Sequence, residues 1–306
     1  MSASFTSALQ AAADAASTQH YPPGTLYVVA TPIGNLADTT LRALHVLGLV
    51  DAVACEDTRH TQALLRAYGI DKSSAQLLAV HQHNESQAAE AVIARLRQGE
   101  RVAYASDAGT PAISDPGARL VAAARAAGCS VVPLPGASSI TAALSVAGIV
   151  QDTGFVFAGF LPSKTAERQA AVLALLAEPR AVVLLEAPHR IEALARALAS
   201  LGERPVTLCR ELTKQFEEVA TVPARTLADW LAAQASRTRG EFVVVVHPAP
   251  PAEAAPADLR VLQLLMAELP LKTAVKLAAE ITGQPRNVLY PAALALKPGA
   301  DEVEDD

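Results

Sequence analysis

The sequence predicts an α/β protein with two α/β domains in series. Short apolar runs alternate with amphipathic helical patterns from Thr25 onward, as is typical of a parallel or mostly parallel sheet covered on both faces. The alternation restarts near Val150, where strand-rich stretches without intervening helices indicate a mixed sheet. Several apolar runs lead into loops rich in Gly, Pro, Ser and Asp, and α/β proteins bind ligands at such strand ends.

The pattern divides the chain into six segments. They are a disordered polar tail, an N-terminal α/β domain, a C-terminal α/β domain, a Pro/Ala linker, a helical segment resembling a helix-turn-helix, and an acidic tail. Their predicted bounds are 1–24, 25–149, 150–248, 249–258, 259–298 and 299–306. The N-terminal stretch lacks the basic region of a signal peptide, which favours a disordered tail.

Composition restricts the class of protein. Hydrophobic residues make up 51% of the 306 residues and aromatic residues 4%, which is typical of a globular protein with a core of Ala, Leu and Val. No apolar run reaches the roughly 18 residues of a membrane span. Cys55, Cys129 and Cys209 are odd in number and lack CxxC spacing, so neither a disulfide framework nor a metal site is expected. We therefore expect a protein of the reducing cytoplasm.

The net charge does not identify the partner. It is −6, but five acidic side chains lie among the last six residues, so the rest of the chain is nearly neutral. A basic surface patch for nucleic acid is compatible with this balance.

The stretch SDAGTPAISDPG, from Ser106 to Gly117, is the strongest local signal of a ligand site. It contains two Gly, two Pro and two Asp, follows the apolar run RVAYA, and precedes a helical pattern. Asp115 and Pro116 are predicted to form the cap and first turn of that helix.

Three such loops follow strands of the first sheet, at 31–35, 106–111 and 135–139. Their backbone N–H groups favour a nucleotide-like cofactor. The GxGxxG fingerprint is absent, and no P-loop lysine indicates a triphosphate.

The second domain gathers charges after apolar strands, in EAPHR (186–190) and RELTKQFEE (210–218). These side chains either line the ligand cleft opposite the three loops of the first domain or form ordinary ion pairs at solvated strand ends. His81 and His83 lie two residues apart, but a metal site needs a third ligand that the sequence does not identify. A polar loop made by His83, Asn84 and Glu85 is the preferred interpretation.

The C-terminal segment has the helix, glycine turn and second helix of a helix-turn-helix, in LKTAVKLAAEITG and QPRNVLYPAALAL. Arg260, Lys272, Lys276 and Arg286 make it mildly basic. Pro291 is predicted to kink the second helix or to end it after Tyr290. RNA docking and a dimer-stabilising cap remain alternative roles.

Nine ordered blocks together resemble one family: TPIGNLADTTLRAL, CEDTRHTQALL, HNES, SDAGTPAISDPG, PLPGASSITAAL, GFLPSK, EAPHR, RELTKQFEE and RGEFVVVV. It is the bacterial ribosomal RNA small subunit methyltransferase I family, within the tetrapyrrole (corrin/porphyrin) methylase superfamily. The resemblance runs from about Thr25 to Val246 and extends into the C-terminal helices.

The resemblance implies a homodimeric class III methyltransferase with S-adenosylmethionine in the cleft between two α/β domains. It also implies that the product is a 2′-O-methylated cytidine in the decoding region of 16S rRNA, formed on free rRNA or on the small ribosomal subunit. The cofactor contacts that it implies are Pro32, Asp107, Ala108, Gly109, Thr110, Pro111, Ile113, Ala137, Ser138, Leu185, Glu186 and Ala187.

Methyl transfer to a ribose hydroxyl requires mainly that the ribose oxygen, the methyl carbon and the sulfur lie in line. A general base would accelerate transfer to the weakly acidic hydroxyl by about 10²–10⁴. The sequence offers six candidates: Glu56, His83, Glu85, Lys164, His189 and Glu211. We select His83, Glu85 and Lys164 as catalytic. The predicted substrate contacts are Arg59, His189, Arg190, Arg210 and Lys214.

Two other functions fit the same fold. A tetrapyrrole methylase would act on a small molecule, but the HNE and EAPHR blocks and the C-terminal helices favour the RNA enzyme. A non-catalytic RNA-binding assembly factor would require a damaged cofactor pocket, and no block is missing.

Overall fold

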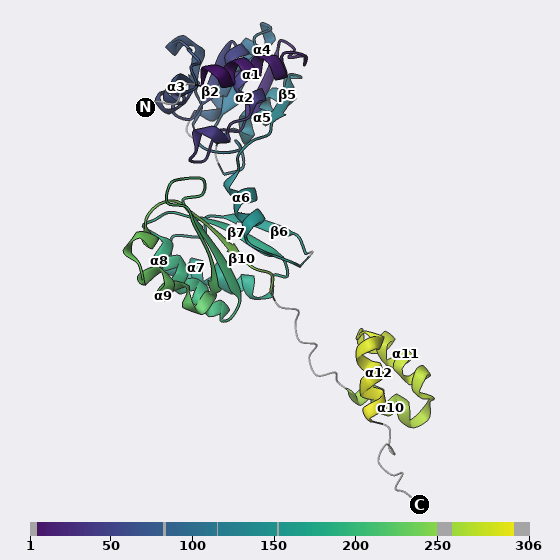
Figure 1. Cartoon of the computed structure of the whole chain (residues 1–306). Coiled ribbons are helices and arrows are strands. Elements are labelled where there is room, and N and C mark those ends of the chain that lie inside the picture. Colours follow the sequence, from purple (N-terminus) through teal and green to yellow (C-terminus); the bar gives the residue numbers. More distant parts are fainter. Residues whose placement is uncertain (1–4, 82–83, 115, 152, 250–258, 297–306) are drawn as a thin grey trace, which may run out of the picture. The chain divides into compact units, whose positions relative to one another are not determined.

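The computed structural model describes residues 5–81, 84–114, 116–151, 153–249 and 259–296. The chain forms two compact units, Met1–Pro248 and Ala249–Asp306, which are described separately. Among the described residues, the first unit holds two sheets and the second holds three helices (Figure 1).

The first sheet has five parallel strands in the order β3-β2-β4-β1-β5. The strands are β1 (Thr25–Val29), β2 (Ala52–Cys55), β3 (Leu77–Ala79), β4 (Val102–Ala105) and β5 (Ser130–Leu134). The order places β4, β1 and β5 side by side, so the three predicted loops leave the same edge of the sheet.

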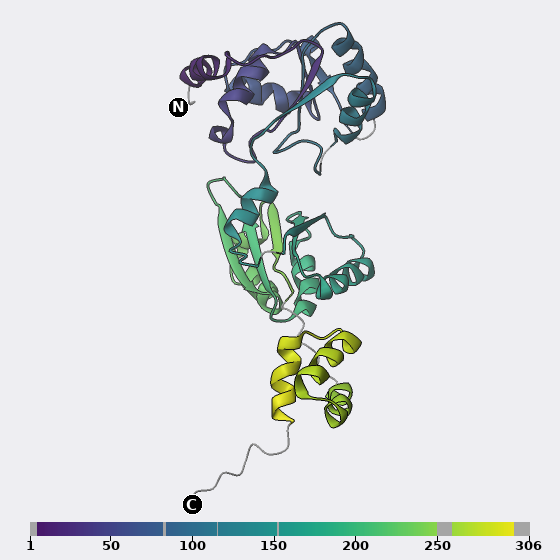
Figure 2. The same cartoon turned by 90° about the vertical axis from the view of Figure 1, so that its right-hand side faces the viewer.

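Helices cover both faces of this sheet, as the predicted alternation requires (Figure 2). Alternate strand residues pack against α2 and α3 on one face and against α4 and α5 on the other. These helices are α2 (Leu41–Leu49), α3 (Thr58–Ala67), α4 (Glu85–Arg97) and α5 (Ala118–Ala126).

The prediction of a disordered tail over 1–24 is wrong for residues 5–24. They include helix α1 (Thr6–Ala16), which packs on α2 and buries Ala12 completely. Phe5 meets the ring of Tyr68 edge-on at 5.0 Å, and the Tyr21 hydroxyl donates to the Ala16 carbonyl over 3.1 Å. The alanine-rich helix gains its stability from this packing, which its own sequence does not reveal.

The second sheet is mixed, as predicted, in the order β6-β7-β10-β8-β9. Only β6 and β7 are parallel neighbours. The strands are β6 (Phe155–Gly159), β7 (Ala181–Glu186), β8 (Pro205–Arg210), β9 (Glu218–Pro223) and β10 (Phe242–Val246). Helices α7 (Thr165–Ala174), α8 (Ile191–Leu198) and α9 (Leu227–Ala232) cover one face (Figure 1).

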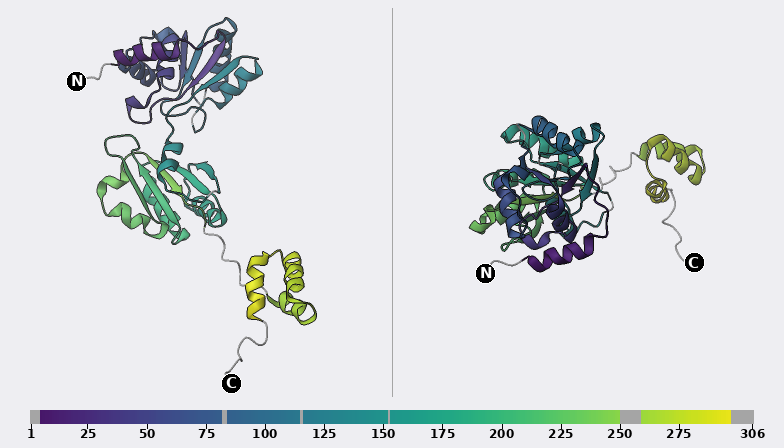
Figure 3. Two further views of the ribbon diagram at one scale, coloured as in Figure 1. Left: turned by 45° about the vertical axis from the view of Figure 1, so that its right-hand side comes forward. Right: turned by 90° about the horizontal axis from the view of Figure 1, so that it is seen from above.

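Helix α6 (Ser139–Val146) covers part of the opposite face of this second sheet. Ala143 of this helix and its C-cap residue Ala147 share a core with Val183 and Val245. The predicted domain boundary between 149 and 150 is therefore too late, because α6 packs with the second sheet (Figure 3). A helix that follows a strand of one sheet and covers another cannot be assigned from local sequence.

The C-terminal unit consists of α10 (Leu259–Glu268), α11 (Leu271–Thr282) and α12 (Arg286–Ala295) around a small apolar core. The predicted glycine turn is present, since Gly283 ends α11 with a left-handed φ of 71°. Of the two outcomes predicted for Pro291, an end of the helix after Tyr290 is wrong, because α12 continues to Ala295 with Pro291 inside it, and a kink stays a prediction. Pro291 has no N–H group to offer the carbonyl of Asn287, but Asn287 is exposed in the first turn of the helix, where water can bond to it.

None of the helices in the described segments is long and apolar enough to cross a bilayer.

The packing of α1 predicts unequal effects at two adjacent alanines. Ala12→Asp places an unpaired charge in the core and should lower the free energy of unfolding by about 2 kcal/mol or more. Ala11→Asp changes an exposed side chain of the same helix and should cost far less. Urea denaturation of the full chain measures both, and equal effects would contradict the packing of α1.

Candidate functional site

The three loops at the edge of the first sheet are tied to one another by hydrogen bonds. Thr31 and Gly109 exchange two backbone bonds, of 2.9 and 3.1 Å. The Thr31 hydroxyl donates to the Ser106 carbonyl, and the Thr110 hydroxyl donates to the Ala137 carbonyl, each over 3.1 Å. The loops therefore form one assembly rather than three separate turns.

Backbone conformation in this assembly requires particular residues. Gly109 has φ 82°, and Ala112 adopts φ 65°, which is unfavourable for a residue with a Cβ. At Gly136 a Cβ would lie 2.8 Å from the Cβ of Ala30. Strained positions held by surrounding structure are concentrated at functional sites, so this loop is the first candidate.

The cap of α5 differs from the prediction. The helix begins at Ala118 after Gly117, whose φ is 121°, and Asp115 lies outside the described residues. The acceptor at the helix start is Glu85, whose Oε1 receives the N–H groups of Gly117 (2.9 Å) and Arg119 (3.0 Å). Because Glu85 is distant in sequence, no local pattern could have identified it as the cap.

Helix α6 covers only part of one face of the second sheet, and a cavity of about 390 Å³ lies over the rest of that face. Leu185, Cys209 and Val243 are cross-strand neighbours on β7, β8 and β10, and they line it. Ile33 and Ala108 line the same cavity from the loops of the first sheet. Burial raises the pKa of Cys209 to about 11, so the thiol is protonated and serves as an apolar surface.

Most of the predicted cofactor positions lie at this cavity or beside it. Ala108, Leu185, Glu186 and Ala187 line the 390 Å³ cavity. A smaller adjoining cavity of about 120 Å³ is lined by Ala108, Gly109, Thr110, Ile113, Ser138 and Leu185, among others.

The remaining cofactor positions have other surroundings. Pro32 and Asp107 line a third cavity, of about 400 Å³, together with Ile33, His60 and Lys214. Ala137 contributes the carbonyl that Thr110 binds, and Pro111 is buried.

Two of the three catalytic candidates, Glu85 and Lys164, lie among the described residues, and both have partners within the protein. His83 lies outside the described residues. Glu85 is buried and holds the two N–H groups at the start of α5, which makes it a positioning group rather than a free base. Lys164 precedes α7 with an 81% exposed side chain and pairs with Glu167 at 2.9 Å.

Two of the predicted substrate contacts bind the protein itself. Arg190 pairs with the fully buried Glu186 at 2.9 Å and also donates to Leu161 and Ser163. Arg210 donates to the carbonyls of Phe216 and Arg239 and pairs with Glu218. Both guanidinium groups are therefore engaged by the protein itself, through acidic partners nearby in sequence and through carbonyl groups of remote segments.

The other three predicted contacts are more accessible. Arg59 is 90% exposed and pairs with Asp57, and this hydrogen bond lowers the pKa of Asp57 to about 2. His189 is exposed. Lys214 bridges Glu211 and Glu241 at 2.9 Å each and packs against Gly34, where a Cβ would lie 2.4 Å from its Cγ.

Sequence reasoning missed residues that only folding brings to these cavities. They include His60, Leu212, Glu241, Phe242 and Val243. Strand periodicity could have placed Val243 on a sheet face, but no pattern showed which face the cavity covers.

Close packing of Gly117 against Tyr104 leads to a stability prediction. In Gly117→Ala the new Cβ would lie 2.1 Å from the Tyr104 ring. Gly128→Ala is the matched control, because Gly128 also has a positive φ but open space around its Cβ position. We expect Gly117→Ala to be less stable than the control by about 1–3 kcal/mol in urea denaturation, owing to overpacking. Similar losses would contradict the packing of this loop.

Comparison with known proteins agrees with this architecture. The family model for tetrapyrrole (corrin/porphyrin) methylases matches residues 25–228, and that for an RsmI C-terminal HTH domain matches residues 252–297. The cobalamin biosynthetic enzyme cobalt precorrin-4 methyltransferase, CbiF, is 18% identical with a TM-score of 0.52, covering 76% of this chain and 100% of its own.

A second solved structure is uroporphyrin-III C-methyl transferase from Thermus thermophilus complexed with S-adenyl homocysteine. It is 16% identical with a TM-score of 0.50, over 72% of this chain and 97% of its own. At these identities the two structures establish the fold alone.

Closer relatives define the family. The ribosomal RNA small subunit methyltransferase I of Escherichia coli O157:H7 is 50% identical over 276 residues, which are 89% of this chain and 95% of that protein. The homologue of Pseudomonas aeruginosa with the same name is also 50% identical, over 280 residues, which are 89% of this chain and 97% of that protein. The chain therefore belongs to the ribosomal RNA small subunit methyltransferase I family, within the tetrapyrrole methylases.

Proposed function

We propose that the protein transfers a methyl group from S-adenosylmethionine to the 2′-oxygen of a cytidine ribose in the decoding region of 16S rRNA. The observation that carries this proposal is the cavity between the hydrogen-bonded loops of the first sheet and the surface of the second sheet. The chain that forms it matches ribosomal RNA methyltransferases over nearly its whole length.

The cavity suits S-adenosylmethionine. Its 390 Å³ lies within the range of about 300–1,000 Å³ that small-molecule sites occupy. The apolar side chains of Leu185, Cys209 and Val243 suit a purine and a thioether chain. Backbone groups and hydroxyls at Ala108, Thr110 and Ser138 suit ribose and amino-acid ends. When bound, the sulfonium supplies an activated methyl group.

The task of the protein is then mainly alignment. Methyl transfer to an oxygen requires that this oxygen lie in line with the carbon–sulfur bond, and a rigid site supplies much of the acceleration by orientation. The ties among the three loops provide such rigidity on the cofactor side.

Two candidate bases are already engaged. Glu85 caps α5. Burial would raise the pKa of Glu211, but the Lys214 ammonium and the Glu241 N–H outweigh it, so this pKa lies below its ordinary value. Because Glu85 is occupied by two N–H groups and Glu211 by Lys214, His83 and Lys164 are the bases that we propose to test.

On the substrate side, Arg59 and His189 are the exposed groups that we propose as RNA contacts. In the C-terminal unit, Lys272 and Lys276 lie one turn apart on α11 and are both exposed, which supports RNA docking through phosphates. We further propose the small ribosomal subunit as the acceptor, the cytoplasm as the compartment and a homodimer as the active form.

The acceptor test uses tritiated S-adenosylmethionine with unmethylated small subunits, free 16S rRNA and a porphyrinogen in parallel. Label in an alkali-resistant dinucleotide is expected from the RNA acceptors, because a 2′-O-methyl group blocks cleavage of the adjacent phosphodiester. Replacement of the target cytidine by its 2′-deoxy analogue in a model RNA should abolish labelling. Label on the porphyrinogen alone would refute the proposal.

Substitution of Glu85 separates a positioning role from a catalytic one. In Glu85→Gln the amide oxygen still accepts the N–H groups of Gly117 and Arg119, so we expect kcat within about threefold of wild type. A general base would instead lose about 10²–10⁴ in this variant. Glu85→Ala leaves one buried and one part-buried N–H donor without Glu85 and should cost about 1–3 kcal/mol of stability. A large loss of kcat in a stable Glu85→Gln protein would restore Glu85 as the base.

A further inference from the structure

The loop between β8 and β9 presents an aromatic side chain to solvent. Phe216 is 66% exposed, although a phenyl ring is usually buried. Its neighbours on the loop are polar or charged, from Lys214 and Gln215 to Glu217. The exposure is therefore that of a single ring on a polar background, not the edge of a wide apolar patch.

This loop is held in a strained conformation. Glu211 and Thr213 have left-handed φ values of 52° and 67°, which cost energy for residues with a Cβ. Gly240 faces Glu211 so closely that a Cβ there would lie 2.5 Å from the Glu211 Cγ. Strain of this kind persists where surrounding contacts determine the backbone. The backbone of the loop that carries Phe216 is therefore held in one conformation.

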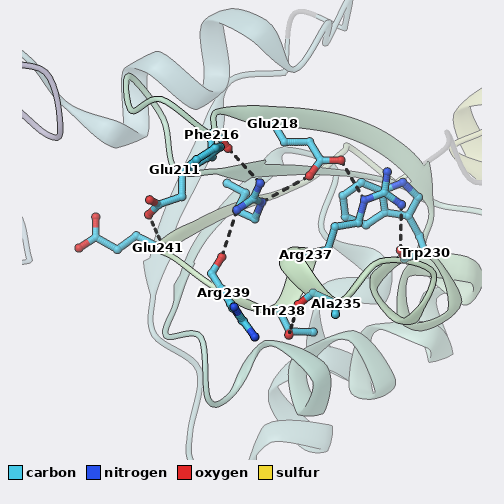
Figure 4. A network of polar contacts seen from close by, with 10 residues as sticks. Glu211, Phe216, Glu218, Trp230, Ala235, Arg237, Thr238, Arg239 and Glu241 are labelled. Carbon is cyan, nitrogen blue, oxygen red and sulfur yellow. Dashed lines mark hydrogen bonds and ion pairs between the residues drawn. The ribbon is translucent and has the colours of Figure 1, made fainter.

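The contacts that fix it form a network (Figure 4). Arg210 donates to the Phe216 carbonyl over 2.9 Å and pairs with Glu218. Glu218 also pairs with Arg237 at 2.9 Å, and the Arg237 guanidinium stacks 3.9 Å over the Trp230 ring. The backbone at Phe216 is thus held by a network of hydrogen bonds and ion pairs, and the exposed ring projects from it.

The ring borders a broad open cavity of about 720 Å³ whose other walls are polar. Gln215, Gln234 and Ser236 contribute amide and hydroxyl groups to it. Arg239 lines it as well, and its guanidinium, pointing away from the network, has no ion-pair partner within the described part of the chain. Two of the three carboxylates there, Glu211 and Glu218, are neutralised by ion pairs.

The lining of this cavity is continuous along the chain with that of the cavity assigned to the cofactor. Leu212 and Glu241 line the 390 Å³ cavity, while their chain neighbours Glu211 and Gly240 line the 720 Å³ cavity. Two chain positions thus link the cavities, one before β9 and one before β10.

An exposed aromatic platform with amide groups and a free guanidinium has the chemistry that binds single-stranded RNA. Unstacked bases stack on aromatic rings, amides bond to base edges, and guanidinium groups bind phosphates. We propose that Phe216 stacks against an unpaired nucleobase beside the methylated nucleotide, with Arg239 on the adjacent phosphate. The inference rests on the proposed RNA substrate, and it assigns an RNA-holding role to residues outside the cofactor cavity.

The test compares Phe216→Ala with Phe216→Tyr in the full-length protein. Affinity for unmethylated small subunits is measured by filter binding with S-adenosylhomocysteine present, and kcat and KM by methyl transfer. We expect Phe216→Ala to weaken binding and raise KM by about 5- to 150-fold, the effect of one lost base stack. Phe216→Tyr should retain wild-type values, and S-adenosylhomocysteine affinity should not change in either variant.

Two further variants sharpen the result. Phe155→Ala removes a comparably exposed ring, 51% accessible, from β6 and should leave subunit binding unchanged. Arg239→Ala should lower the slope of log affinity against log salt by about 0.7–0.9, the value of one phosphate contact.

Equal subunit affinity of wild type and Phe216→Ala would overturn the inference. A change of oligomeric state in Phe216→Ala, measured by light scattering, would also overturn it by assigning the ring to a contact between copies of the chain. Failure of the proposed function is distinct, because wild-type protein would then place no label on a ribose oxygen.

Discussion

The paired hydrogen bonds between Thr31 and Gly109 are the constraint on which the site depends. They join the loop after β1 to the loop after β4, and the Thr110 hydroxyl extends the tie to the loop after β5. Parallel strands make this possible, because their carboxyl ends meet at one edge of the sheet. Gly109, with its positive φ, lets the chain turn back at the bridge without strain.

The second sheet contributes one of its faces to the site, whereas the first sheet contributes loops. Helices α7, α8 and α9 bury one face fully, while α6 covers only part of the other. The apolar residues left on β7, β8 and β10 then become the floor of a cavity. The charged side chains at the ends of these strands bind one another, as Glu186 does with Arg190 and Glu211 does with Lys214. Glu186 lines the 390 Å³ cavity and Lys214 lines the 400 Å³ cavity, so these ion pairs hold charged side chains in place at the cavity walls.

Local patterns in the sequence were enough for the parallel first sheet, the mixed second sheet and the position of the three loops. Each depends on periodicity or on Gly and Pro within a few residues. The failures concern contacts between remote segments. Three contacts of this kind are the packing of α1 on α2, the packing of α6 on the second sheet and the capping of α5 by Glu85. Each joins residues too far apart in sequence for a local pattern to predict it. Phe216 was missed because a lone aromatic in a charged stretch has no periodic signature.

The central claim is that the tied loops and the second sheet together hold S-adenosylmethionine. A crystal structure of the full chain with S-adenosylhomocysteine tests it most directly. The account predicts a ligand that contacts the 106–111 loop with one part and the Leu185–Val243 floor with another. A ligand bound wholly in the cavity lined by His60 and Lys214, without contact to Leu185 or Val243, would contradict it.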